Sequence, residues 1–248
     1  REECGVFAIY GHEDASRVAF FGLFALQHRG QESAGIVSSD GCQVWNHKGM
    51  GLASEVFKEP TLQKLPGKLA IGHVRYSTTG SSVLSNAQPF LVHFADEYYA
   101  LAHNGNIINA QQLRQELETK ASIFQSTMDS EIIIHLMAPY LKEGLEKALI
   151  AALARMEGAY SIIMLTRDKI IAARDPRGFR PLSLGKLNGS WVVASETCAF
   201  DLVGAQYIRD VSPGEIIIID ATGCQSITPF PAVKSCHCIF ELIYFARP

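Results

Sequence analysis

The sequence predicts an α+β fold in which two sheets are layered with helices outside. Strand-like apolar runs occupy both ends of the chain, and segments with helical periodicity are grouped between residues 109 and 156. This grouping is typical of a layered α+β domain. No internal repeat, low-complexity stretch or linker occurs before about residue 228. We therefore expect one layered domain over most of the chain.

The first hundred residues predict one helix among five strands. The apolar run 4–10 stops at Gly11 and is typical of a buried strand. Apolar residues then recur at helical spacing over 15–27, and Arg29-Gly30 provides a helix stop. Asp40-Gly41 is a turn signal between the next two strands. The other strands are expected at 34–38, 43–47, 69–76 and 98–103, and the last two run directly into polar loops that contain glycine.

The middle of the chain predicts helices, and the remainder returns to strands. Asn109 can cap a helix that ends near Thr119, and Asp129 heads a second helix that includes Met137. A third helix is expected at 144–156. The later strands are expected at 159–165, 169–174, 182–187, 191–194 and 215–220, with a hairpin signal at Asn188-Gly189.

Composition narrows the classes of function. Hydrophobic residues make up 48% and charged residues 19% of the chain, which is a globular balance. The net charge of −3 provides no basic surface for nucleic acid, and no apolar run approaches the roughly 18 to 20 residues of a membrane helix. The six cysteines are scattered, and a chain of this length needs no disulfide framework. We therefore expect a cytoplasmic protein with no nucleic-acid or membrane partner.

Cys4 is the first candidate for chemistry. A cysteine in a buried strand usually acts as a small hydrophobic side chain, and that alternative is open. The catalytic interpretation needs Cys4 to become the first residue, because a free α-amine titrates near ~7.7–8.0 and can take the proton of its own thiol. Gly5 beside it would leave room for a substrate. No histidine base is then needed, and His73 is interpreted as structural.

Two candidates of opposite charge could hold a free amino acid. Arg75 ends an expected strand, where an arginine is commonly part of a surface ion pair. Its planar guanidinium could instead form two hydrogen bonds with an α-carboxylate, with the Thr78 hydroxyl nearby. Asp129 could cap the helix that it heads, and its carboxylate could also pair with a substrate ammonium. These two interpretations of Asp129 are compatible.

Asn104-Gly105 follows an expected strand. Such a pair is most often only a turn. The Asn104 amide and the backbone N–H of Gly105 could instead form an oxyanion hole, in which one donor typically contributes about 2.7–4 kcal/mol of transition-state stabilisation.

Other site signatures are missing from the sequence. It contains no glycine-rich phosphate-binding loop and no Gly-x-Ser-x-Gly nucleophile elbow. The cluster Cys236-His237-Cys238 has too few ligands, at the wrong spacing, for a closed zinc site.

Taken in order, these stretches resemble the N-terminal-nucleophile glutamine amidotransferases over almost the whole chain. The motifs that carry the resemblance are Cys-Gly-Val-Phe from Cys4, Gln-His-Arg-Gly-Gln-Glu-Ser-Ala-Gly from Gln27, Gly-His-Val-Arg-Tyr from Gly72, His-Asn-Gly from His103 and Asp-Ser-Glu from Asp129. Each motif is weak alone, whereas all five in this order are specific.

Four further stretches of the sequence are most similar to one branch of that family. These stretches are 26–32, 174–182, 195–201 and 238–248. Full-length enzymes of this branch transfer ammonia to phosphoribosyl pyrophosphate and make phosphoribosylamine, the first step of purine biosynthesis. Sister branches that make glucosamine phosphate, asparagine or glutamate share the catalytic loops and are an alternative.

The resemblance implies a four-layer αββα sandwich of two antiparallel sheets. It also implies a glutamine site, whose residues are Cys4 as nucleophile, Asn104 and Gly105 as oxyanion hole, and Arg75, Asp129, Thr78, Arg29 and Gly30 at the substrate. This glutaminase domain would need no cofactor of its own.

The resemblance further implies a longer protein. Residues 1–3 resemble the end of a propeptide, 4–228 would form the glutaminase domain, and 229–248 would begin a connection to a phosphoribosyltransferase domain. That domain would bind phosphoribosyl pyrophosphate with magnesium, and the full-length protein is expected to be a homo-oligomer. Some relatives hold a 4Fe-4S cluster through a cysteine at the position of Cys238, and others do not. Because Cys4 has an acylated nitrogen as written, a non-catalytic sensing module with a blocked Cys4 is a second alternative.

Overall fold

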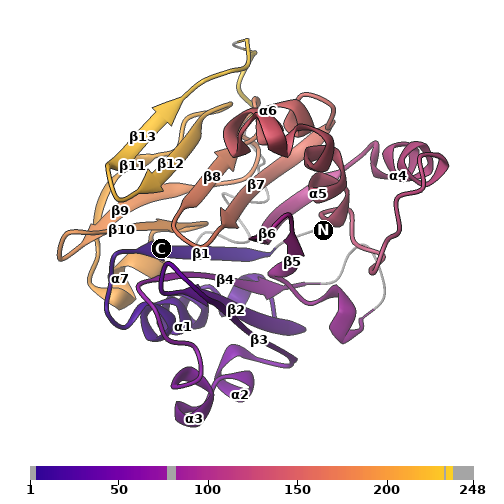
Figure 1. Ribbon diagram of the computed structural model, residues 1–248. Helices are drawn as coiled ribbons and strands as arrows, with labels where there is room; N and C mark the ends of the chain where they lie inside the picture. The colour runs from indigo at the N-terminus through magenta and orange to yellow at the C-terminus, as the bar shows by residue number, and fades with distance from the viewer. Residues whose placement is uncertain (1–3, 77–81, 232, 237–248) are drawn as a thin grey trace.

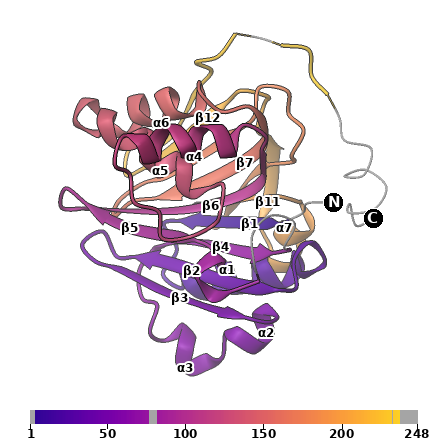
Figure 2. The same cartoon turned by 90° about the vertical axis from the view of Figure 1, so that its right-hand side faces the viewer.

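Two antiparallel sheets stack face to face, and helices cover the outer face of each (Figures 1 and 2). The computed structural model describes residues 4–76, 82–231 and 233–236. The first sheet has the strand order β11-β9-β10-β1-β4-β2-β3, and the second has the order β13-β12-β8-β7-β6-β5. The expected four-layer α+β sandwich is therefore confirmed.

The strands of the first sheet are β1 (Gly5–Tyr10), β2 (Ser33–Ser39), β3 (Val44–Met50), β4 (Leu69–Arg75), β9 (Ser183–Leu187), β10 (Ser190–Ala194) and β11 (Gln206–Asp210). Those of the second sheet are β5 (Phe90–Phe94), β6 (Glu97–Ile107), β7 (Gly158–Leu165), β8 (Ile170–Arg174), β12 (Ile216–Asp220) and β13 (Gly223–Ile227). The helices outside the first sheet are α1 (Ala15–Ala25), α2 (Ala53–Val56), α3 (Glu59–Leu62) and α7 (Cys198–Val203). Those outside the second sheet are α4 (Ala110–Thr119), α5 (Glu131–Met137) and α6 (Leu145–Leu153).

Strand β1 shows why the chain folds into these layers. Val6 and Ala8 lie in the apolar layer between the two sheets, whereas Phe7 and Ile9 lie in the layer beneath α1 and α7. Side chains alternate between the two faces of a strand, so a strand with sheet on one face and helix on the other must be apolar throughout. The uninterrupted apolar run that predicted this strand follows from its burial on both sides.

The structure corrects several sequence predictions. The strand expected at 98–103 is β6, which continues to Ile107, so Asn104-Gly105 is not a turn after the strand. The helix expected at 15–27 ends at Ala25 and is followed by a 3₁₀ turn at Gln27–Arg29. Elements that the sequence did not predict are α2, α3, α7, β5, β11 and β13.

The structure confirms the predicted hairpin turn but not the predicted helix cap. Asn188 and Gly189 both have positive φ, 48° and 91°, and join β9 to β10 as the hairpin signal predicted. Asn109 precedes α4 but makes no side-chain cap to it. Its amide instead donates to Arg155 O at 2.9 Å, and its Oδ1 accepts from Glu157 N at 3.0 Å.

The expected domain limits, 4–228 and 229–248, stay predictions, and β13 ends at Ile227.

Candidate active site

One pocket brings together residues from five parts of the chain. Of the predicted site residues, Cys4, Arg75, Gly105 and Asp129 line it. Cys4 and Arg75 lie side by side because β1 and β4 are neighbours, with Gly5 opposite Val74. Strand β6 of the second sheet packs against both strands and carries the glycine into the same place. The interface between the sheets therefore assembles the pocket.

The nitrogen and the sulfur of Cys4 have distinct surroundings. The backbone nitrogen donates a hydrogen bond to Asn104 Oδ1 at 3.3 Å, and Sγ lies 4.0 Å from Tyr76 O. Burial raises the pKa of the Cys4 thiol to about 11, although the charges of Arg75 and Arg29 act in the opposite direction. The thiol is therefore protonated at neutral pH. A thiolate at this site requires a nearby base to take that proton.

Asn104 carries a buried donor with nothing to donate to among the described residues. Its side chain is fully buried, and its Nδ2 lacks a hydrogen-bond partner there. A buried N–H without a partner costs about 1–3 kcal/mol, so such a group in a native fold calls for an explanation. A substrate oxygen that accepts a hydrogen bond from Asn104 Nδ2 only when the substrate is bound would explain it.

Gly105 must be glycine for reasons of space. Its φ is +149°, and a Cβ there would lie 2.0 Å from Ala159 O in β7. Strands β6 and β7 pair directly at this point, with Gly105 opposite Tyr160 and Asn104 opposite Ser161. Sheet pairing, and not a turn, therefore fixes the Asn104-Gly105 pair.

Arg75 is a buried guanidinium at the end of β4. It is 4% exposed, and its Nη1 donates to Glu32 Oε1. The backbone of β4 is approached closely here, because a Cβ on Gly30 would lie 2.6 Å from Arg75 N. Gly30 therefore lets the 3₁₀ turn at Gln27–Arg29 pack directly against the strand that carries Arg75.

Asp129 presents an anion to the same pocket. Burial alone would raise the pKa of its carboxyl, but His103 and the backbone N–H groups of Ile107 and Ser130 outweigh that effect and lower it. Oδ2 accepts a hydrogen bond from Ile107 N at 3.0 Å, and Oδ1 lies 3.6 Å from His103 Nδ1. The helix begins two residues later with Ser130 as its cap position. The carboxylate thus joins β6 to the start of α5 and does not cap the helix.

Arg29 lies behind the nucleophile. Its side chain is fully buried, its Nε donates to Cys4 O at 2.9 Å, and its Nη1 pairs with Glu196 Oε1. Contact of Arg29 and Gly30 with a substrate stays a prediction. Thr78, Cys238 and residues 1–3 lie outside the described residues.

Sequence reasoning missed several residues at the site. Those lining the pocket that it did not propose are Tyr76, Gln88, His103 and Met128. Glu196 was noted only as part of a family-like run, and nothing in the sequence pairs it with Arg29. His73 is fully buried, and burial lowers its pKa to about 3. Its Nε2 donates to His103 O at 3.0 Å, so His73 is a neutral residue that supports β6.

One group of three possible metal ligands occurs in the described part of the chain. Ligand atoms of His28, Glu196 and Cys198 lie within 4.8 Å of one another. The Glu196 carboxylate already accepts from His28 and pairs with Arg29, so hydrogen bonds and charge account for the convergence.

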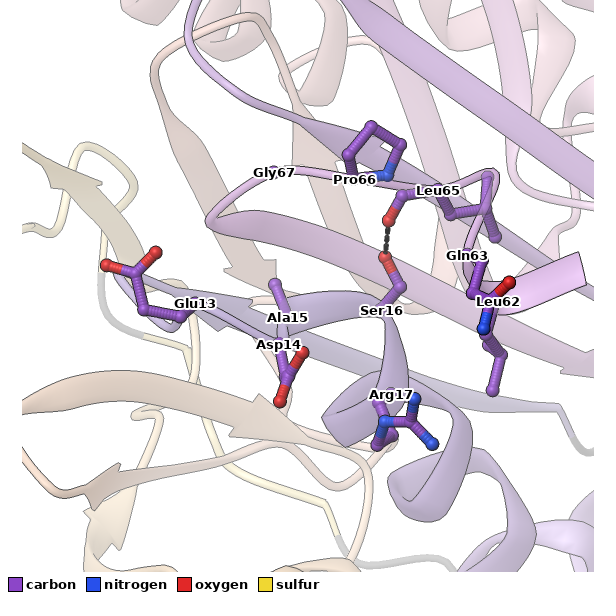
Figure 3. Close-up of a pocket in the computed structure, with 10 residues that line it drawn as sticks. All are labelled: Glu13, Asp14, Ala15, Ser16, Arg17, Leu62, Gln63, Leu65, Pro66 and Gly67. Carbon is purple, nitrogen blue, oxygen red and sulfur yellow. Dashed lines mark hydrogen bonds between the residues drawn. The ribbon is translucent and has the colours of Figure 1, made fainter. Parts of the chain in front are cut away.

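A second hollow lies away from this pocket, between the start of α1 and the segment joining α3 to β4 (Figure 3). A hydrogen bond from Ser16 Oγ to Leu65 O joins the two segments that line it. None of its ten lining residues was predicted to act at a site.

Comparison with known proteins identifies the family. Residues 73–201, just over half of the chain, match the model of the glutamine amidotransferase domain. The chain therefore belongs to the glutamine amidotransferase domain family.

Particular relatives narrow the similarity further. The chain is 48% identical over its whole length to the amidophosphoribosyltransferase of Bacillus subtilis, of which it covers 52%. It is 49% identical to amidophosphoribosyltransferase 2, chloroplastic, of Arabidopsis thaliana, of which it covers 45%. The chain thus spans about half the length of the curated relatives that it matches.

Solved structures agree with this result. The glutamine phosphoribosylpyrophosphate amidotransferase of B. subtilis, complexed with ADP and GMP, superposes with a TM-score of 0.93 at 46% identity. The match covers 99% of this chain and 53% of that one. No helix in the described part of the chain is long and apolar enough to cross a membrane.

Proposed function

We propose that this chain hydrolyses glutamine to glutamate and ammonia, with Cys4 as the nucleophile. The observation that carries the proposal is that a thiol, a guanidinium and a carboxylate line one pocket, from Cys4, Arg75 and Asp129. A free amino acid carries a carboxylate and an ammonium at one end, and Arg75 and Asp129 complement these two charges. Glutamine held there directs its side-chain amide toward the sulfur.

The reaction then follows from the atoms around Cys4. Once the Glu3–Cys4 bond is cleaved, the α-amine takes the thiol proton, and the sulfur attacks the amide carbon of glutamine. Asn104 Nδ2 and the Gly105 N–H stabilise the oxyanion. The amine returns the proton to the departing nitrogen, ammonia leaves, and a thioester remains. Water hydrolyses the thioester to glutamate and restores the thiol.

The full-length protein would use this ammonia to make phosphoribosylamine from phosphoribosyl pyrophosphate. The names of the relatives support this acceptor over the sister acceptors, and the chain covers about half of each. The remaining half would bind phosphoribosyl pyrophosphate with magnesium. Cys4, Cys42, Cys224 and Cys236 are free thiols in the described part of the chain, which supports a reducing compartment such as the cytoplasm.

Expression of the full gene tests the proposal. We expect the mature protein to begin at Cys4 by intact mass and N-terminal sequencing, and a glutamine-analogue electrophile to label that residue. Cys4→Ala should abolish glutamine use but retain ammonia-dependent synthesis, whereas Cys42→Ala, at an exposed thiol, should retain both. A chain that still begins at Arg1 and resists labelling would reject the enzyme. Glutamine use by Cys4→Ala would show that another residue is the nucleophile.

A further inference from the structure

The segment that follows β10 contacts the nucleophile strand directly at Val6 and, through Arg29, at Cys4. Ser195 N donates to Val6 O at 3.0 Å, and Ser195 Oγ accepts from Val6 N at 3.0 Å. The next residue, Glu196, reaches the carbonyl of Cys4 through Arg29. The position of Cys4 therefore depends on residues that are far from it in the sequence.

Glu196 is built into a buried network of charges. Its Oε2 lies 3.1 Å from His28 Nε2, and its Oε1 pairs with Arg29 Nη1. Burial alone would raise the pKa of Glu196, but His28 and Arg29 lower it, so the carboxylate is charged at neutral pH. Its side chain is 11% exposed, and that of Arg29 is 0% exposed. Glu196 thus supplies a buried counter-charge to Arg29.

The guanidinium group transmits this constraint. It is planar and rigid, so anchoring Nη1 also sets the direction in which Nε points. Nε donates to Cys4 O at 2.9 Å. Loss of the Glu196 carboxylate removes the contact that anchors Nη1 in this buried pair, so the guanidinium can turn toward other partners or water. Such a movement would withdraw the donor from the nucleophile's own carbonyl.

We propose that Glu196 is a positioning residue for the nucleophile and acts through Arg29. The inference rests on the proposed glutaminase function. Glu196 contacts neither Arg75 nor Asp129 in any hydrogen bond of the described residues, and those two residues are the ones assigned to the charged ends of glutamine. Loss of Glu196 should therefore change the rate of the chemical step more than substrate binding.

The test compares Glu196→Gln with Glu215→Gln in the full-length mature protein. Glu215 is a matched control because it is 3% exposed and forms a two-point pair with Arg209 away from the pocket. We expect Glu196→Gln to lower glutaminase kcat by up to about 100-fold, as misplacement of a reacting group does, with little change in KM. Labelling of Cys4 by a glutamine-analogue electrophile should slow in parallel, while ammonia-dependent synthesis persists. Glu215→Gln should leave glutaminase kcat close to that of the wild type.

Two further variants separate positioning from stability. Glu196→Asp keeps the charge on a shorter side chain, so its kcat should lie between those of the wild type and Glu196→Gln. Arg29→Lys combined with Glu196→Gln should be no slower than Arg29→Lys alone, because both changes remove one path to Cys4 O. If Glu196→Gln does not fold, a lowered kcat with unchanged KM in Glu196→Asp supports the inference.

Three results would overturn it. These are a wild-type kcat in Glu196→Gln or in a folded Glu196→Asp, a rise in KM instead of a fall in kcat, and an equal loss in Glu215→Gln. Absence of glutaminase activity in the mature wild type is a different result, because it rejects the proposed function itself.

Discussion

The backbone nitrogen of Cys4 donates a hydrogen bond to Oδ1 of Asn104 over 3.3 Å, which joins the residue before β1 in one sheet to β6 in the other. The same amide has its Nδ2 buried without a partner among the described residues. One end of the Asn104 side chain thus holds the nitrogen that would become the catalytic base. The other end is available for the oxygen that would become negatively charged.

This relationship predicts a large effect of Asn104→Ala on the chemical step. Loss of one oxyanion donor typically lowers kcat by about 100-fold to about 1,000-fold, and KM should change little because the donor acts mainly in the transition state. Glutaminase kinetics of the full-length mature protein measure the effect. Asn46→Ala, at an exposed position on β3, is the control. A kcat for Asn104→Ala similar to that of the control would remove Asn104 from the oxyanion hole.

The five site residues that the sequence predicted and the structure describes near the pocket all stand at the boundary of an expected strand or helix. Cys4 begins and Arg75 ends an expected strand, Asn104-Gly105 is a polar pair after an expected strand, and Asp129 heads an expected helix. Local sequence shows such positions directly. It could not show that Asn104-Gly105 lies within a strand, because both residue types favour turns and only pairing with β7 overrides that preference.

Features that depend on distant partners escaped prediction. Glu196 and Arg29 are 167 positions apart, and no periodicity joins them. The edge strand β11 is mostly exposed and lacks the alternation of a half-buried strand, so its sequence resembles a loop. The layers were predictable because burial on both faces leaves a continuous apolar run, whereas edges and ion pairs are decided by the assembled fold.

The surroundings of Cys4 predict a specific dependence of activity on pH. The raised pKa of the thiol, about 11, keeps the sulfur protonated across the physiological range. Proton transfer to the α-amine is therefore required, and that amine accepts a proton only above its own pKa, near ~7.7–8.0. Glutaminase kcat/KM should fall by about tenfold per pH unit below that range and level off above it.

The pH profile of the mature protein distinguishes two mechanisms. A plateau beginning near the pKa of an α-amine supports the amine as base. A rate that continues to rise toward about pH 11 would instead mean that the thiolate forms without it. The rate of Cys4 labelling by the glutamine-analogue electrophile gives an independent profile that does not depend on ammonia detection.

Arg75→Ala should weaken the binding of glutamine. A contact with the α-carboxylate is present in both the bound substrate and the transition state, so its loss raises KM more than it lowers kcat. The control is Arg209→Ala, which breaks the ion pair of another arginine with a buried carboxylate, that of Glu215, away from the pocket. An unchanged KM in Arg75→Ala would exclude Arg75 from the grip on glutamine.

Gly105→Ala should damage both stability and catalysis. The new Cβ would lie 2.0 Å from Ala159 O, so β6 and β7 must separate at the point where Gly105 lines the pocket and Asn104 precedes it. An alanine forced into an incompatible backbone destabilises by more than about 1 kcal/mol, and displacement of the donors should lower kcat. Gly41→Ala measures backbone strain alone, because Gly41 also has a positive φ, +96°, but no atom lies within 4 Å of its Cβ position. Thermal unfolding and glutaminase kinetics should show a greater loss of stability and of kcat for Gly105→Ala than for Gly41→Ala. Equal losses in the two variants would mean that backbone strain, and not the contact with β7, makes glycine necessary at position 105.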